Sequence, residues 1–292
     1  MNFFQEKIST YRKNNPFLFF FFASWILVAF LLIFLDLPLS IYLVDYNSSW
    51  AKFIALYGEF PGHLVLSISI FVLITYGVND SNWSNDLIKI SGLILNSVFI
   101  TSIFYTLLPE TAWKIEEGMI VIGLVLICQG VTMIFIKQKG LNPKQKYVDA
   151  ARTSFLLGVI NPLLFVQSFK ILWGRMRFRD LTGNYQGFTS WIIPQGITGH
   201  KSFPSGHTAM GWMVLPILFL LPRTGKLRRV IQGMIYLWGT IVGVGRIVIG
   251  AHYASDVLFS TGVAFTAYFY LINRKERKNS QQHYRKNSWS VI

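Results

Sequence analysis

The chain has 292 residues, of which 52% are hydrophobic and only 14% are charged. Soluble domains carry about 25% charged residues, so this composition excludes an ordinary soluble protein and indicates a polytopic membrane protein. The net charge of +14 would suit a nucleic-acid-binding protein, but its distribution along the chain assigns it to the membrane instead. The single cysteine, Cys128, excludes a disulfide framework and a cysteine-rich zinc site.

Apolar runs predict an all-α transmembrane helical bundle with about eight spans, six being the lower count. The first run, residues 16–35, is long enough to cross a bilayer core of about 30 Å. It lacks the small-residue cleavage site of a signal peptide, so we expect an uncleaved span. Residues 39–61 mix charged and apolar side chains, which is typical of an interfacial or extramembrane helix. Seven further runs follow at residues 62–78, 87–108, 118–136, 153–169, 208–221, 230–244 and 257–272.

The positions of Lys and Arg predict that both termini lie on the cytoplasmic side. With this orientation, 19 of the 27 basic residues fall on inner segments, and the stretch 274–286 becomes a lipid-facing tail rather than a nucleic-acid arm. Cations that remain on the outer side predict an anionic ligand there, a solvated loop being the alternative. Eight basic residues remain on the outer side, and the six that we associate with this ligand are Lys170, Arg175, Arg177, Arg179, Lys201 and Arg246.

Residues 245–256 lie between the last two apolar runs and contain Arg246, His252 and Asp256. Ionisable side chains at a membrane boundary are rare unless they are paired or functional. If the chain is helical from Tyr253 onward, His252 and Asp256 are four residues apart and share one face. The carboxylate would then hold one ring nitrogen and leave the other free for chemistry. An ion pair that only packs helices together is the alternative interpretation.

The loop 169–209 opens with Lys170 and Arg177 and closes with Pro204-Ser205-Gly206-His207, directly before an apolar run. A helix that begins here would direct free backbone N–H groups and its positive dipole end towards a ligand above it. Gly206 allows close approach of the backbone, and Ser205 adds a hydroxyl group. Fixed cations, helix-end amides and a hydroxyl are the parts that hold a phosphate. For Pro204 and Ser205 alone, an ordinary helix start is the alternative.

Taken in chain order, three stretches of this sequence resemble the motifs of the type 2 phosphatidic acid phosphatase superfamily of integral membrane phosphatases. They are Lys170 with Arg177, then Pro204 to His207, and then Arg246 with His252 and Asp256. The family motifs are K-x6-R-P, P-S-G-H and S-R-x5-H-x3-D, and the resemblance covers residues 170–256. Two positions depart from the pattern. Phe178 stands where the family has proline, which affects backbone stiffness. Gly245 stands where the family usually has serine, which removes a potential hydrogen-bond donor to the phosphate.

The resemblance implies a role for each motif residue. His252, oriented by Asp256, would attack phosphorus and form a phosphohistidine, while His207 would protonate the leaving oxygen. The remaining positions would stabilise charge on the phosphate oxygens: Lys170, Arg177, Ser205, Gly206 and Arg246. Protein cations take the place of magnesium in this scheme, so neither a metal nor another cofactor is implied. Four further residues of this loop fall outside the motifs: Arg175, Arg179, His200 and Lys201. We expect them either to support the site or attract substrate, or to belong to a solvated loop.

The implied function is hydrolysis of a lipid phosphate or diphosphate at the extracytoplasmic face of the cell membrane. Undecaprenyl diphosphate, phosphatidylglycerophosphate, phosphatidic acid and lipid A phosphates are all candidate substrates. We expect one membrane-embedded phosphatase domain over residues 1–292, with a catalytic core at about 152–273 and a basic cytoplasmic tail at 274–292. The expected partners are the lipid substrate and the bilayer, not nucleic acid, and the oligomeric state is left open. A non-catalytic lipid-phosphate binding or transport protein on the same scaffold is the alternative; it would need the cations but not both histidines.

Overall fold

The computed structural model describes residues 16–77, 83–107, 115–140, 144–222 and 224–289. The structure is 80% helical, and no strand occurs within these ranges, which confirms the predicted all-α class. The described residues of each predicted apolar run lie almost entirely on helical segments. The helical elements are α2 (Pro16–Leu43), α3 (Ser49–Tyr57), α4 (Phe60–Tyr76), α5 (Trp83–Leu107), α6 (Ile115–Gln138), α7 (Gln145–Gly158), η2 (Val159–Val166), α8 (Gln167–Trp173), η3 (Phe178–Asp180), η4 (Gly183–Tyr185), α9 (Gly206–Gly211), η5 (Trp212–Leu220), α10 (Lys226–Val248) and α11 (Ala254–Trp289).

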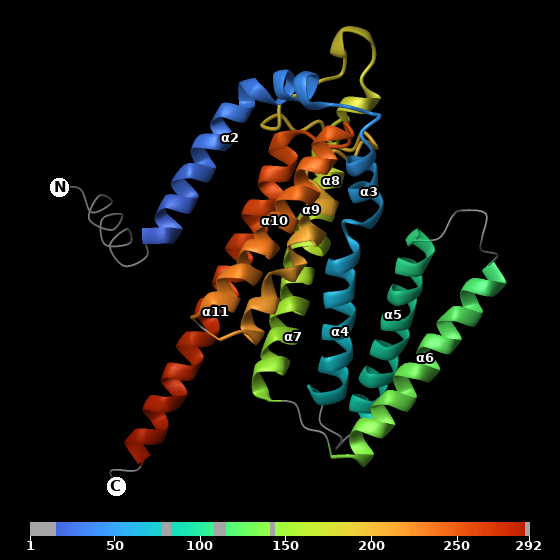
Figure 1. Cartoon of the computed structure of the whole chain (residues 1–292), viewed down its shortest axis with the longest axis vertical. Helices are drawn as coiled ribbons and strands as arrows, with labels where there is room; N and C mark the ends of the chain where they lie inside the picture. Colours follow the sequence, from blue (N-terminus) through green and yellow to red (C-terminus); the bar gives the residue numbers. More distant parts are fainter. Residues whose placement is uncertain (1–15, 78–82, 108–114, 141–143, 223, 290–292) are drawn as a thin grey trace.

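The chain reverses direction along the bundle from one long helical stretch to the next, with α3 and α4 forming one such stretch and α7, η2 and α8 another (Figure 1). The end of α11 lies at one end of the molecule, whereas the start of α2 lies about midway along it. The connection from α8 to α9 and the turn between α10 and α11 lie at the other end. The segments that carry the three motifs therefore meet at one end of the bundle, opposite the end of α11.

Among the residues that the structure describes, six stretches are long and apolar enough to cross a membrane, which indicates a multi-pass membrane protein. They are Phe19–Leu43, Ser49–Tyr76, Met119–Gln138, Gln145–Asp180, Lys226–Val248 and Ala254–Lys275. The segment Gly206–Leu220 is apolar but shorter. An aromatic and aliphatic core surrounds it, and Gly239 of α10 approaches the Trp212 ring so closely that a Cβ there would lie 2.5 Å from ring atoms. The segment that begins at Gly206 is thus fixed in the middle of the bundle.

The region 39–61 differs from the interfacial helix that was predicted for it. Its first residues extend α2 to Leu43, and α3 joins α4 within one candidate span. The reason is packing, because Ala51 and Ile54 on one face of α3 are buried. Ile54 lies against Gly245 of α10. This contact holds α3 beside the end of α10 that carries Arg246.

The helical stretch that leads to Lys170 changes from α-helix to π-helix and back to α-helix. Between α7 and α8 it widens into the π-helical stretch η2, which contains Pro162. Proline has no backbone N–H to donate, and such local π-turns are frequent near functional sites. The buried Asn161 donates from Nδ2 to the Ser260 carbonyl oxygen at 3.3 Å, which ties this stretch to α11. Lys170 follows in the last turn of α8.

Candidate active site

The three motifs contact one another at a single place in the fold. Lys170 of the first motif lies beside the second, since a Cβ on Gly206 would be 3.2 Å from its Nζ atom. The second motif contacts the third through the Ser205 backbone N–H, which donates to the Asp256 carbonyl oxygen at 3.1 Å. Within the third motif, the backbone N–H of His252 donates to the Arg246 carbonyl oxygen at 3.1 Å. Segments that are distant in sequence therefore form one site.

The turn between α10 and α11 sets the position of His252. Helix α10 ends at Val248, and Gly250 reverses the chain with a positive φ of 65°, a conformation that favours glycine. Helix α11 begins at Ala254, one residue after the predicted start, so Asp256 lies in its first turn. The Asp256 Oδ2 atom is 3.3 Å from Nδ1 of His252 and accepts the Tyr253 backbone N–H at 3.0 Å.

His252 is 2% exposed and Asp256 is fully buried. Burial lowers the pKa of His252 to about 3, and the nearby charges of Arg246 and Lys170 act in the same direction. The hydrogen bond and the charge of Asp256 oppose this shift. The imidazole is therefore neutral at neutral pH. With Nδ1–H directed at the carboxylate, the lone pair is on Nε2, which is the form that a nucleophile needs.

Arg175 holds Asp256 from the other side. Its guanidinium contacts Asp256 Oδ1 at 2.7 Å and Asp36 Oδ2 at 2.9 Å, and all three side chains are fully buried. The same guanidinium donates to the Thr189 carbonyl oxygen and stacks 3.9 Å from the centroid of the Tyr253 ring. Arg175 was predicted to support the site, attract substrate or face solvent. Its burial excludes the solvated loop and makes it a support of the carboxylate.

Two further residues complete this buried network, and the sequence analysis missed both. Asp36 of α2 accepts the Ser255 backbone N–H at 2.9 Å and also contacts the Ser255 hydroxyl. Ser202 donates its hydroxyl to Asp256 Oδ2 at 2.6 Å. An acidic side chain at the end of a long apolar run was a usable signal for Asp36, because such residues are costly in a membrane unless paired. No sequence signal distinguished Ser202 from its neighbours.

The second motif places His207 in the first turn of α9. Ser205 caps this helix, since its Oγ atom accepts the Thr208 backbone N–H at 3.3 Å. Ser205 is fully buried, so the predicted helix start is present while its predicted contact with phosphate stays a prediction. The His207 Nδ1 atom is 2.9 Å from Oε1 of Glu59, a residue that the sequence analysis placed only in a mixed segment. Both side chains are partly exposed, at 29% and 28%.

Two of the predicted phosphate-binding cations, Arg246 and Lys170, act electrostatically on His252. Arg246 is buried and Arg177 is half-buried. Within the described parts of the chain, no hydrogen-bond acceptor reaches the Nε atom of either guanidinium. Buried donors are normally satisfied, so these two nitrogens are suited to an anionic ligand. Arg179 and Lys201 are exposed, with Arg179 only 3.8 Å from its neighbour Asp180.

The two departures from the family motifs are explained by packing. A Cβ on Gly245 would lie 2.9 Å from Cγ2 of Ile54, so a serine here would collide with α3. Phe178 is buried and stacks on Tyr185 with ring centroids 5.6 Å apart. Its ring also meets Tyr253 edge-on at 6.3 Å, next to His252. An aromatic ring thus fills the position where the family has proline.

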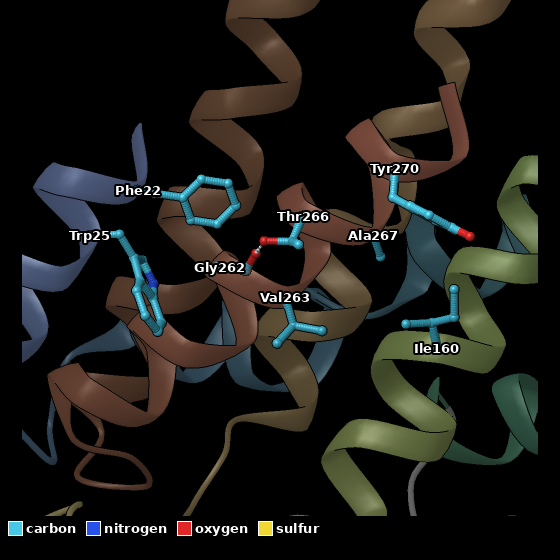
Figure 2. Close-up of a pocket in the computed structure, with 8 residues that line it drawn as sticks. All are labelled: Phe22, Trp25, Ile160, Gly262, Val263, Thr266, Ala267 and Tyr270. Carbon is cyan, nitrogen blue, oxygen red and sulfur yellow. Dashed lines mark hydrogen bonds between the residues drawn. The ribbon is translucent and has the colours of Figure 1, made fainter. Parts of the chain in front are cut away.

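Neither of two further cavities includes His207 or His252. One, of about 320 Å³, is apolar and lies between α2, α11 and η2; Figure 2 shows its lining residues Phe22, Trp25, Ile160, Gly262, Val263, Thr266, Ala267 and Tyr270. The other, of about 410 Å³, is lined by Tyr46, Lys52, Ala55, Leu56, Arg179 and Ile249. Among the residues that the structure describes, no group of three His, Cys, Asp or Glu side chains is arranged to hold a metal ion.

Comparison with known families agrees with the geometry. Residues 151–279 match the family model of the PAP2 superfamily, which supports the resemblance to the type 2 phosphatidic acid phosphatase superfamily. The matched segment contains all three motifs, whereas Asp36 and Glu59 lie outside it. No curated protein and no solved structure matches the chain.

Proposed function

We propose that the protein is an integral membrane phosphatase that hydrolyses a lipid phosphate or diphosphate. The observation that carries this proposal is the pairing of His252 with Asp256, within reach of the charges of Lys170 and Arg246. PAP2 superfamily members are typically phosphatases, and the membrane-helical fold suits a lipid substrate. The domain limits predicted above, with a catalytic core at about 152–273, are part of the proposal.

The first half of the reaction transfers the phosphoryl group to the protein. The lone pair on Nε2 of His252 attacks phosphorus, and the bond from phosphorus to the lipid oxygen breaks. His207 gives its proton to that leaving oxygen, which is an alkoxide for a monoester and a phosphate oxygen for a diphosphate. Asp256 stabilises the positive charge that develops on the His252 ring, as a buried carboxylate does in other triads.

The second half releases phosphate. Neutral His207 takes a proton from water, and the water oxygen attacks phosphorus as the bond to His252 Nε2 breaks. Lys170, Arg177 and Arg246 stabilise the charge on the equatorial oxygens in both halves. These cations supply the stabilisation that magnesium supplies in other phosphoryl transfers, so the proposed reaction needs no metal.

The proposed working face is extracytoplasmic. The positive-inside distribution supports it, because the end of the bundle with the three motifs is opposite the end with the basic part of α11. A lipid phosphate in the outer leaflet would present its headgroup at that level. The same surface would serve all four candidate lipids. The sequence is rich in Phe, Ile, Lys and Asn, which is typical of AT-rich bacterial genomes, and for a bacterial protein we favour a lipid of the cell envelope.

The test is phosphate release from purified protein in detergent, with the four candidate lipids as substrates. We expect release from at least one lipid in the wild type and none from His252→Ala. Activity that survives EDTA and is blocked by vanadate, a mimic of the five-coordinate phosphoryl centre, would support the metal-free mechanism. Lipid binding without phosphate release in the wild type would instead favour the binding or transport protein.

A further inference from the structure

Glu59 is the acidic side chain that contacts the second histidine, and it comes from a part of the chain outside the PAP2 match. We infer that Glu59 is a positioning residue for His207, holding Nδ1 so that Nε2 exchanges the proton with the leaving group and with water. The inference rests on the proposed function, since it gives His207 a partner equivalent to the Asp256 carboxylate of His252. A complete site then consists of two histidine–carboxylate pairs.

The contact is fixed by close helix packing. Glu59 directly precedes α4, and a Cβ on Gly62, one turn later, would lie 2.1 Å from the Met210 carbonyl oxygen of α9. Only glycine permits this approach of α4 to α9. On the other side of α9, a Cβ on Gly211 would lie 3.0 Å from Val242 of α10. With α9 held between its neighbours, the first turn of α4 places Glu59 beside His207.

The charges around Glu59 connect it to the phosphate site. Its carboxylate interacts electrostatically with Lys170 and Arg246, as well as with His207 and His63. A carboxylate near bound phosphate would by itself repel the substrate. It is tolerated when it is paired with a protonated imidazole, because the pair is then neutral. The 2.9 Å distance between Oε1 and Nδ1 favours this pairing over a free charge.

The experiment compares Glu59→Gln with the wild type on two substrates that differ in leaving group. A lipid phosphate needs a proton on its alkoxide, whereas p-nitrophenolate leaves without one. We expect Glu59→Gln to lower kcat on the lipid about tenfold or more and kcat on p-nitrophenyl phosphate less than about threefold. Asp180→Asn is the matched control: it also removes one carboxylate near the outer cations, but Asp180 contacts Arg179 and not His207. The control should leave the ratio of the two rates unchanged.

A double variant shows whether Glu59 acts through His207. In the His207→Ala background, Glu59→Gln should have almost no further effect on kcat, because residues that act as a unit are not additive. Equal loss on both substrates, or full additivity with His207→Ala, would overturn the inference and leave a structural role. A fall in KM alone would also overturn it and assign Glu59 to repulsion of substrate. These results differ from failure of the proposed function, in which the wild type itself releases no phosphate.

Discussion

The guanidinium of Arg175 and the carboxylate of Asp256 lie 2.7 Å apart with no exposed surface on either side chain. Asp36 of α2 contacts the same guanidinium, so one cation is shared by two buried acids. In such an arrangement, removal of the cation leaves charges that nothing compensates. The residue that orients His252 is therefore stabilised by a helix near the start of the chain.

We expect Arg175→Met to destabilise the protein by about 3–5 kcal/mol, as measured for broken buried ion pairs. Thermal unfolding in detergent, followed by tryptophan fluorescence, measures the change. Adding Asp36→Asn should restore part of the loss, since it removes one of the two uncompensated acids. Asp149→Asn breaks the more exposed pair with Lys275 and serves as control, with an expected cost of at most about 1 kcal/mol. Similar stability of Arg175→Met and Asp149→Asn would contradict the network described here.

The lowered pKa of His252 predicts that its ring does not titrate between pH 8 and pH 5. NMR of protein labelled with ¹³C at histidine Cε1 measures this, with the signal assigned by its loss in His252→Gln. Because the folded pKa of about 3 lies below the ordinary value of 6.5, the ring stays neutral as the pH falls. The unfolded chain gains the proton below about pH 6.5, so His252 makes folding less favourable from there down to about pH 3. A signal that moves between pH 8 and 5 would show that the buried ring is charged.

The two histidines should respond differently to the leaving group. His252→Ala removes the covalent step, so turnover of a lipid phosphate and of p-nitrophenyl phosphate should both fall to background. His207→Ala removes the acid, whose contribution is typically about 10²–10⁴-fold, and should spare the aryl substrate. Steady-state rates on both substrates measure the contrast. If His252→Ala retained lipid turnover, His252 would not be the nucleophile and the roles assigned to the two histidines would be wrong.

Serine at position 245, the usual residue of the family motif, should destabilise this protein instead of improving it. The added Cβ would lie 2.9 Å from Cγ2 of Ile54, and overpacking of this kind costs about 1–3 kcal/mol. Ile54→Leu removes the Cγ2 methyl group at similar volume, so Gly245→Ser should cost less in that background. Thermal unfolding of the two single variants and the double variant gives the coupling. Gly245→Ser with wild-type stability and higher turnover would mean that a lost hydrogen bond, and not packing, explains the glycine.

The proposed orientation predicts which residues an impermeant maleimide reaches in intact cells. The background is Cys128→Ala, because Cys128 is free and exposed on α6. A cysteine at Asn184, in the α8–α9 connection, should be labelled, and one at Asn279, near the end of α11, should not. Permeabilised cells are the control, in which both should react. The opposite pattern would place the active face in the cytoplasm.

Local patterns predicted much of this structure because their partners are close in sequence. His252 and Asp256 are one helical turn apart, and the apolar runs contain their own helical hydrogen bonds. The partners of Arg175 could not be found in this way, since Asp36 is 139 residues away. The link between Glu59 and His207 likewise depends on how α4 packs against α9. Helix packing depends on side-chain shapes across the whole bundle, which a local sequence pattern does not contain. The need for glycine at position 62, for example, is visible only once the Met210 backbone is placed beside it.

The shared cation Arg175 has a consequence for exchanging parts between related proteins. Residues 151–279 contain all three motifs, which makes them an obvious segment to exchange. In a chimaera, the corresponding segment of a different protein that matches the PAP2 model would replace them. Asp36 would then face an arginine from the other protein, and Gly62 would face the other protein's α9. Unless α2, α3 and α4 were transplanted with it, the graft would bring its own histidines but not the helices to which they are fitted.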